Sequence, residues 1–445
     1  MASELTNSHS GFAPTGLRRE QLLDSVHNDA SSRDEFALKL LIVSLFIPEG
    51  FSFFIGDFRL SVTRVLVILF ATKVMLRMGR RQGVRLASDN MMLISAVWML
   101  LAGAVTEGFS GMKGAGILAI EFVGTYLAFR YLTPSGASVR IVRFACKVVV
   151  VIVGLAFLDV LTGRLFTYET VKGLTGYVKP SYEAALAAYA ESLFRDGAIR
   201  AMGPLEHSIL FGAVCAWWGT LAFFVFPGLF GWTIAGAALF GILISQARAP
   251  LLGFAIGIGL VLFYAGTRSF PHRWKVLGAL IGLLLMFIFS FSGSPIATLM
   301  KLGGISPEAA WYRQAIWDTA VPLIMQSPVF GIGVSPDWDW GTNSALIGDS
   351  VDAFWLRIAM MYGIPGAIFI FAAMVSAFWG GPIDKWPAFS SEERRLSVAL
   401  GVATVTAVFL GFTVHFWGAT WIMLAIFPAL RAVLVEQVLL CREVR

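Results

Sequence analysis

Charged residues are scarce in this sequence: 14% of the 445 residues are charged and 57% are hydrophobic. A soluble domain carries roughly 25% charged residues, and a water-soluble fold cannot hide so much apolar surface. The low charge therefore excludes a soluble globular protein. The net charge of +6 does not indicate a nucleic-acid partner, because the basic residues lie in short clusters between apolar runs. We expect no nucleic-acid binding.

Cysteine is also rare, with three residues in the whole chain. Cys146 and Cys215 lie in apolar runs and Cys441 lies near the end, so their spacing is not typical of a metal site or a disulfide. They read as packing residues. The sequence lacks an HExxH, a CxxC and a Walker loop as well. We therefore expect neither a metal nor another cofactor.

The apolar residues are gathered in runs of about 17 to 25 residues, which is the length that a helix needs to cross a ~30 Å hydrocarbon core. A helix satisfies its backbone hydrogen bonds internally while it crosses. We predict an all-α polytopic membrane helical bundle of about twelve helices. The expected spans are 36–48, 60–76, 90–105, 114–132, 141–161, 207–226, 230–245, 251–266, 276–291, 363–379, 396–413 and 420–436, with an interfacial helix over 354–362.

Lysine and arginine recur in every second loop between these runs, in 73–85, 130–147, 268–275, 384–395 and the C-terminal residues. Because such residues are retained in the cytoplasm, we expect a bacterial inner-membrane protein with both termini on the cytoplasmic side. The expected parts are a disordered cytoplasmic N-terminus over 1–35, a single transmembrane domain over 36–438 with periplasmic loops at about 162–206 and 293–350, and a cytoplasmic tail over 439–445. Amphipathic stretches over 182–194 and 313–325 predict short helices on the bilayer surface.

Four outward-facing places hold polar residues in apolar company. In the first, Arg200, Glu206 and His207 directly precede a span. Arg200 and His207 could be interfacial anchors. In the second, Arg248 lies in a tight turn between two spans, against the positive-inside trend. An arginine in this position either snorkels to the interface or binds an anion, and we favour anion binding.

The third place carries Arg313 and Asp318 on a short helix, and the fourth carries Asp349, Asp352 and Arg357 just before a span. Arg313 and Asp318 could form a solvated face, and Asp349 could cap the following helix. Guanidinium groups match phosphate oxygens bidentately, and this attraction is screened less near a bilayer than in water. Together, the arginines and carboxylates predict a site for a phosphorylated, lipid-linked substrate.

Taken in order, these segments resemble the O-antigen ligase and Wzy-type polysaccharide polymerase superfamily over roughly residues 40 to 380. The resemblance rests on five segments in order. They are a first hairpin over 46–70, an Arg-x-x-Gly stretch over 199–212 and a Ser-x-x-Arg turn over 244–254. An Arg-and-Trp helix with a Pro-x-x-Gly-x-Gly loop follows over 311–333, and an Asp, aromatic, Leu and Gly pattern over 350–366. It implies a GT-C-like fold and a metal-independent glycosyl transfer, at the periplasmic face, from an undecaprenyl diphosphate-linked glycan.

By matching position, the resemblance implies that Arg200, Arg248 and Arg313 bind the diphosphate while a base takes the proton of the acceptor hydroxyl. Ligases tend to have a histidine in the second outer loop, where this chain has Asp349 and Asp352. That difference favours polymerisation of an exopolysaccharide or O-antigen repeat over ligation to lipid A core.

The candidate bases are Asp352 and Asp349, with His207 as the alternative. An O-antigen ligase, or a transporter or flippase of an anionic lipid-linked substrate, are the other functions considered. A transporter should carry charges at mid-bilayer depth, where Glu121 is the one plausible candidate. We expect Glu121 to be a packing residue, paired with an arginine or a hydroxyl on a neighbouring helix. The expected partners are the lipid-linked glycan, membrane lipids and a polysaccharide chain-length regulator.

Overall fold

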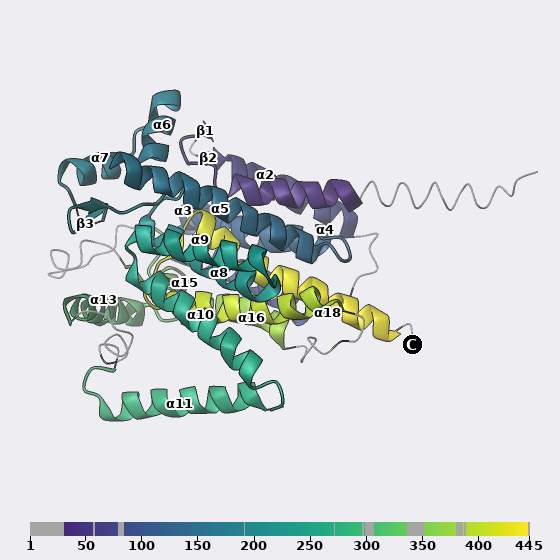
Figure 1. Ribbon diagram of the computed structural model, residues 1–445. Coiled ribbons are helices and arrows are strands. Elements are labelled where there is room, and N and C mark those ends of the chain that lie inside the picture. The colour runs from purple at the N-terminus through teal and green to yellow at the C-terminus, as the bar shows by residue number, and fades with distance from the viewer. Residues whose placement is uncertain are drawn as a thin grey trace, which may run out of the picture.

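The computed structural model describes residues 31–56, 58–78, 84–190, 192–270, 272–295, 298, 307–335, 351–379, 386 and 389–443. Within these ranges the chain is almost entirely helical, and the sheet is limited to two short antiparallel hairpins (Figure 1). The hairpins pair β1 (Ser52–Ile55) with β2 (Phe58–Ser61), and β3 (Phe194–Arg195) with β4 (Ala198–Ile199). The prediction of an all-α membrane bundle is confirmed.

The helices of the first half are a helix over 31–44, α2 (Val62–Met78), α3 (Ala87–Ala119), the π-helical turn η1 (Ile120–Gly124), α4 (Thr125–Leu132), α5 (Ser138–Thr162), α6 (Phe166–Thr175), α7 (Pro180–Ala187) and α8 (Ser208–Val225). Those of the second half are α9 (Leu229–Ser245), α10 (Arg248–Gly266), α11 (Arg273–Phe291), α13 (Pro307–Gln326), α15 (Phe354–Val375), the 3-10 turn η3 (Ser376–Phe378), α16 (Ser391–Leu410), α17 (Ala419–Met423) and α18 (Ile426–Glu443). The first of these helices begins inside the segment 1–35 that was expected to be disordered.

Seven helical stretches of the described chain are long and apolar enough to cross a membrane. They are Ala87–Leu132, Ser138–Thr162, Ser208–Val225, Arg248–Gly266, Arg273–Phe291, Phe354–Phe378 and Ala419–Leu440. The protein is therefore an integral membrane protein. The number of about twelve spans stays a prediction.

The stretch Ala87–Leu132 combines two expected spans, because the chain reverses at Gly108. This residue has φ 62° and ψ −137°, a conformation that only glycine adopts readily. The two arms of α3 then lie side by side: a Cβ added to Gly103 would approach the carbonyl oxygen of Gly111 to 2.6 Å. The spans predicted over 90–105 and 114–132 are thus two arms of one hairpin.

A second break joins the expected interfacial helix over 354–362 to the span that follows it. The backbone leaves the helical conformation at Gly363, inside α15. The loop after α13 hydrogen-bonds to both sides of this break: Ile332 N donates to Met360 O at 2.7 Å, and Ile364 N donates to Pro328 O at 2.8 Å. The Pro-x-x-Gly-x-Gly loop therefore anchors α13 to α15.

The helices differ sharply in burial. Nearly every residue of α8 is buried, and this helix packs against α9, α10 and α16 at the centre of the bundle. In α11, only Arg273 and Ile288 are buried, and Figure 1 shows this helix standing apart from the others. An apolar helix that faces lipid needs no protein partner for its surface. Cys146 and Cys215 are buried free thiols, as expected of packing residues.

Ion pairs between neighbouring helices satisfy the charges inside the bundle. Glu121 pairs with Arg64 of α2 at 2.6 Å, which confirms the prediction that it is a packing residue with an arginine partner. Arg130 is completely buried between Glu436 at 2.5 Å and Asp89 at 3.3 Å. This pairing links α4 to α18 and α3.

The elements of the two long polar segments lie at one end of the bundle, which we call the outer end. Figure 1 shows α6, α7, β3 and α13 there, whereas the C-terminus and the start of the first described helix lie at the opposite end. The stretch 182–194 is helical only up to Ala187, but the helix expected over 313–325 is present within α13. The shared end agrees with the loop charges, and its periplasmic orientation stays a prediction.

Candidate functional site

Arg313 of α13 connects three segments that are distant in the sequence. Its Nη1 donates to the backbone oxygen of Asp352 at 3.3 Å and to the backbone oxygen of Thr413. Asp352 lies two residues before the start of α15, and Thr413 lies in residues 411–418, which we call the α16–α17 loop. Arg313 is thus a built-in part of the outer end and not a member of a solvated face. Asp318 is exposed and bonds to Gln314 instead.

The carboxyl group of Asp352 interacts electrostatically with two arginines and a histidine. Burial lowers the pKa of Arg313, and the negative charge of Asp352 opposes this effect. The same carboxylate interacts electrostatically with Arg357 in the first turn of α15 and with His207 at the start of α8. Arg313 therefore lies against the backbone of Asp352, and the charge of Asp352 acts on His207. Asp349 lies outside the described residues.

His207 has a fixed tautomer because it caps α8. Its Nδ1 accepts a hydrogen bond from Ile209 N at 3.1 Å. Burial, reinforced by the positive charges of Arg200 and Lys179 and opposed by Asp352, lowers the pKa of His207 to about 4. The ring is then neutral at pH 7 with its proton on Nε2. Its Nδ1 is thus occupied and its Nε2 is a hydrogen-bond donor, which argues against the use of His207 as the base.

Arg200 is buried beside the turn between α9 and α10. Its Nε donates to Ser245 O at 3.4 Å and its Nη1 to Ser192 O at 3.3 Å. Arg248 begins α10 on the far side of that turn, is exposed, and makes no hydrogen bond or ion pair with another described residue. Arg200 thus supports the turn and acts on His207 through its charge, whereas the Arg248 side chain is open to a ligand.

The sequence interpretation missed the α16–α17 loop. The Trp417 ring lies 6.0 Å from the ring of His207 and stacks on that of His415 at 5.3 Å. His415 Nδ1 is buried and has no hydrogen-bond partner among the described residues. Burial, with a contribution from Arg357, lowers the pKa of His415 well below its ordinary value. The sequence did carry a signal for this loop: His415 lies two residues before Trp417, at the outer end of an apolar run.

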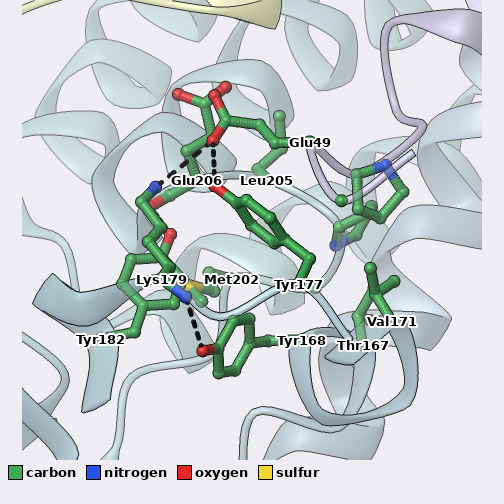
Figure 2. Close-up of a pocket in the computed structure, with 14 residues that line it drawn as sticks. Glu49, Thr167, Tyr168, Val171, Tyr177, Lys179, Tyr182, Met202, Leu205 and Glu206 are labelled. Atoms are coloured by element: carbon green, nitrogen blue, oxygen red, sulfur yellow. Dashed lines mark hydrogen bonds and ion pairs between the residues drawn. The ribbon is translucent and has the colours of Figure 1, made fainter. Parts of the chain in front are cut away.

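A small pocket adjoins this group at the outer end and has a volume of about 40 Å³. It is lined by residues 48–50, by α6 and the start of α7 with the segment that joins them, and by residues 202–206. Figure 2 shows the side chains of Glu49 and Glu206 next to each other, with Tyr177 and Lys179 directed at Glu49. Tyr177 Oη lies 3.4 Å, and Lys179 Nζ 3.8 Å, from the Glu49 carboxylate.

The two carboxyl groups of this pocket differ in charge. Burial and the neighbouring Glu49 raise the pKa of Glu206 to about 8, so Glu206 is protonated at neutral pH. Burial works to raise the pKa of Glu49 too, but the cations of Lys179 and Arg59 hold it below its ordinary value. Arg59 Nη1 lies 3.2 Å from the Glu49 carboxylate. The pocket therefore contains one carboxylate and one carboxylic acid.

The pocket and the group around Asp352 share a wall. Glu206 directly precedes His207, and its carboxyl group lies so close to Gly418 of the α16–α17 loop that a Cβ there would collide with it. Within the described ranges no cluster of three or more His, Cys, Asp or Glu side chains is arranged as metal ligands. The absence of a metal from the reaction remains a prediction of the sequence.

Residues 233–371 match a family model described as O-Antigen ligase. The matched part begins in α9 and ends in α15, and it carries Arg248, Arg313 and Asp352. No curated protein matches the chain. The residues of the pocket in Figure 2 all precede the matched part.

Proposed function

We propose that this chain belongs to the O-antigen ligase and Wzy-type polysaccharide polymerase superfamily, and that it is an inner-membrane glycosyltransferase that polymerises undecaprenyl diphosphate-linked repeats on the periplasmic side. The observation that carries the proposal is the contact of Arg313 with the backbone of Asp352 and with the α16–α17 loop, whose Trp417 ring lies 6.0 Å from the ring of His207. These residues come from α13, from the segment before α15 and from the cap of α8, and no packing requirement of an apolar bundle calls for such a polar group.

The arginines would stabilise the leaving group. In the proposed reaction an acceptor hydroxyl forms a bond to the anomeric carbon of the donor sugar, and the bond from that carbon to the diphosphate breaks. The leaving undecaprenyl diphosphate keeps the electron pair and its negative charge. Arg313 and Arg248 neutralise this charge, and the Nε2 proton of His207 adds a hydrogen bond. Arg200 supports the turn that carries Arg248.

A carboxylate would complete the proton balance. The acceptor hydroxyl loses its proton as it attacks. We assign this proton to Asp352 because that carboxylate interacts electrostatically with Arg313, Arg357 and His207. His207 is set as a donor by its bond to Ile209 and is not assigned this role. Asp349 remains a candidate from the sequence.

Polymerisation is favoured over ligation by the resemblance, because aspartates replace the histidine that ligases tend to carry. The ligase alternative uses the same site with a lipid acceptor. Transport is disfavoured, since the ion pair of Glu121 with Arg64 leaves no uncompensated deep charge there to carry an ion or headgroup. Cytoplasmic termini and a chain-length regulator as partner belong to this proposal.

The experiment is a deletion strain complemented with arginine variants. A polymerase-null cell should accumulate single repeats on the lipid carrier, whereas a ligase-null cell still makes polymer on the carrier. Arg248→Ala and Arg313→Ala should fail to restore polymer although the protein is inserted. Arg164→Ala is the matched control, because Arg164 is exposed at the outer end and its side chain makes no hydrogen bond or ion pair with a described residue. Normal polymer length in both site variants would overturn the assignment.

A further inference from the structure

We propose that the pocket of Figure 2 is the acceptor subsite, which binds the terminal sugar of the acceptor glycan through its hydroxyl groups. The proposal rests on the proposed function, because an acceptor subsite has meaning only if glycosyl transfer occurs beside it. It adds a site outside the residues 233–371 that match the family. The acceptor would then be selected by the N-terminal half of the chain.

The size of the pocket fits a sugar edge. A buried water needs about 10 to 15 Å³ of such volume, so a pocket of about 40 Å³ has room for about three waters. One edge of a pyranose presents hydroxyl groups at comparable spacing, and each hydroxyl can replace one water and take over its hydrogen bonds. A whole sugar ring does not fit, so the rest of the ring would project toward the α16–α17 loop.

The polar groups of the pocket suit hydroxyl ligands, which both donate and accept hydrogen bonds. Glu49 offers carboxylate oxygens as acceptors, and the protonated Glu206 beside it, whose proton is hydrogen-bonded to Glu49, offers its other carboxyl oxygen as a further acceptor. Thr167 provides an independent indication of a ligand: its Oγ1 is buried in the pocket lining and has no hydrogen-bond partner among the described residues. A buried hydroxyl without a partner is uncommon, and rotation of the Thr167 side chain toward the pocket would let a sugar hydroxyl satisfy it.

Tyrosine rings form the apolar part of the same pocket. Tyr168 and Tyr182 pack edge to face with ring centroids 5.1 Å apart. Their hydroxyl groups already have protein partners, since Tyr168 donates to Glu183 and Tyr182 donates to the backbone oxygen of Glu206. These residues therefore offer ring surface, which packs against the C–H groups of a sugar.

The position of the pocket sets the direction of the acceptor. Glu206 lines the pocket and directly precedes His207, and His207 interacts electrostatically with Asp352. A sugar held by Glu49 and Thr167 would thus present another of its hydroxyls toward Asp352, the proposed proton acceptor. Binding in the pocket and chemistry at Asp352 would be separate functions of adjoining residues.

The test measures acceptor binding and transfer separately. The probe is the soluble oligosaccharide repeat, released by mild acid from the lipid carrier of the same cells and titrated into the full-length protein in nanodiscs by saturation-transfer NMR. Glu49→Gln should weaken binding about tenfold or more, because it removes a charged acceptor, and the isosteric Thr167→Val about fivefold. With the same oligosaccharide as acceptor in the transfer assay, KM should rise by these factors while kcat changes less than about twofold.

Glu169→Gln is the matched control, because it removes one carboxylate from the exposed face of α6, outside the pocket. It should leave oligosaccharide binding and transfer as in the unmodified protein. Unchanged oligosaccharide binding in both Glu49→Gln and Thr167→Val would overturn the subsite while leaving the proposed reaction intact. Oligosaccharide binding that depends on Glu49 and Thr167, without any transfer by the unmodified protein, would overturn the proposed function alone. A fall in kcat with KM unchanged would reassign the pocket to a structural role.

Discussion

Replacing Glu206 by glutamine should remove a pH-dependent loss of stability above neutral pH. The pKa of Glu206 is raised from 4.5 to about 8 by burial and by Glu49, so the folded protein holds a proton there that the unfolded chain has released. An acid whose folded pKa is raised contributes stability that is lost as the pH rises through that value. From pH 7 to pH 9 the loss amounts to about 1.4 kcal/mol.

The contribution of Glu206 to stability is best measured above pH 7. At lower pH the buried histidines change the free energy of unfolding in the opposite direction. The pKa of His207 is lowered to about 4, so the folded state disfavours a proton that the unfolded chain takes up below about pH 6.5. His415 behaves in the same way. Glu49, with its lowered pKa, is ionised throughout this range. Between pH 7 and pH 9, Glu206 is therefore the titrating group of the pocket.

The assay is thermal unfolding of the purified protein in nanodiscs at pH 7, 8 and 9. The unmodified protein should lose a few degrees of Tm over this range, since a change of 1 kcal/mol shifts Tm by about 2 to 4 °C in domains of a few hundred residues. Glu206→Gln should lose measurably less, and Glu169→Gln should follow the unmodified protein. If Tm falls equally from pH 7 to pH 9 in the unmodified protein and in Glu206→Gln, Glu206 is not protonated at neutral pH.

Two further predictions concern the core and the site. Arg64→Leu should lower the free energy of unfolding by about 3 to 5 kcal/mol, because it leaves Glu121 buried without its partner, and Arg64→Leu with Glu121→Leu should recover most of this loss in a double-mutant cycle. A double variant no more stable than Arg64→Leu would contradict this view. Asp352→Asn removes the proposed proton acceptor and should lower kcat for polymer formation by about 100-fold or more, with donor affinity changed little. Single-turnover transfer measures this change. A normal kcat would show that Asp352 is not the proton acceptor.

The helices were predictable because membrane-spanning helices need long apolar runs, and the runs are visible in composition alone. The pairing of Glu121 with an arginine followed from the cost of an isolated charge in the bilayer. The chain reversal between the spans over 90–105 and 114–132 was predicted, but its tight form at Gly108 was not, because two runs separated by a short polar segment read the same whether or not the helices merge. Arg313 and Asp352 were recognised as candidates because both are polar residues at the ends of apolar segments.

The surroundings of these candidates could not be predicted in the same way. Thr413 binds Arg313 through its backbone, which leaves no trace in the side-chain pattern. Glu49 and Glu206 lie far apart in the sequence and meet only through the packing of the first hairpin against the segment before α8. The tautomer of His207 depends on a cap hydrogen bond that appears only when the start of α8 is known. Tertiary contacts, and not local pattern, decide all three.

The most direct test is the affinity of the protein for undecaprenyl diphosphate, measured in nanodiscs by native mass spectrometry. Each charge-assisted hydrogen bond to the diphosphate is worth about 1.5 to 3 kcal/mol, so Arg313→Ala and Arg248→Ala should each weaken binding about 10-fold to 100-fold. Arg164→Ala should bind as tightly as the unmodified protein. Equal affinity of the unmodified protein and both site variants would contradict a diphosphate site built from Arg248 and Arg313.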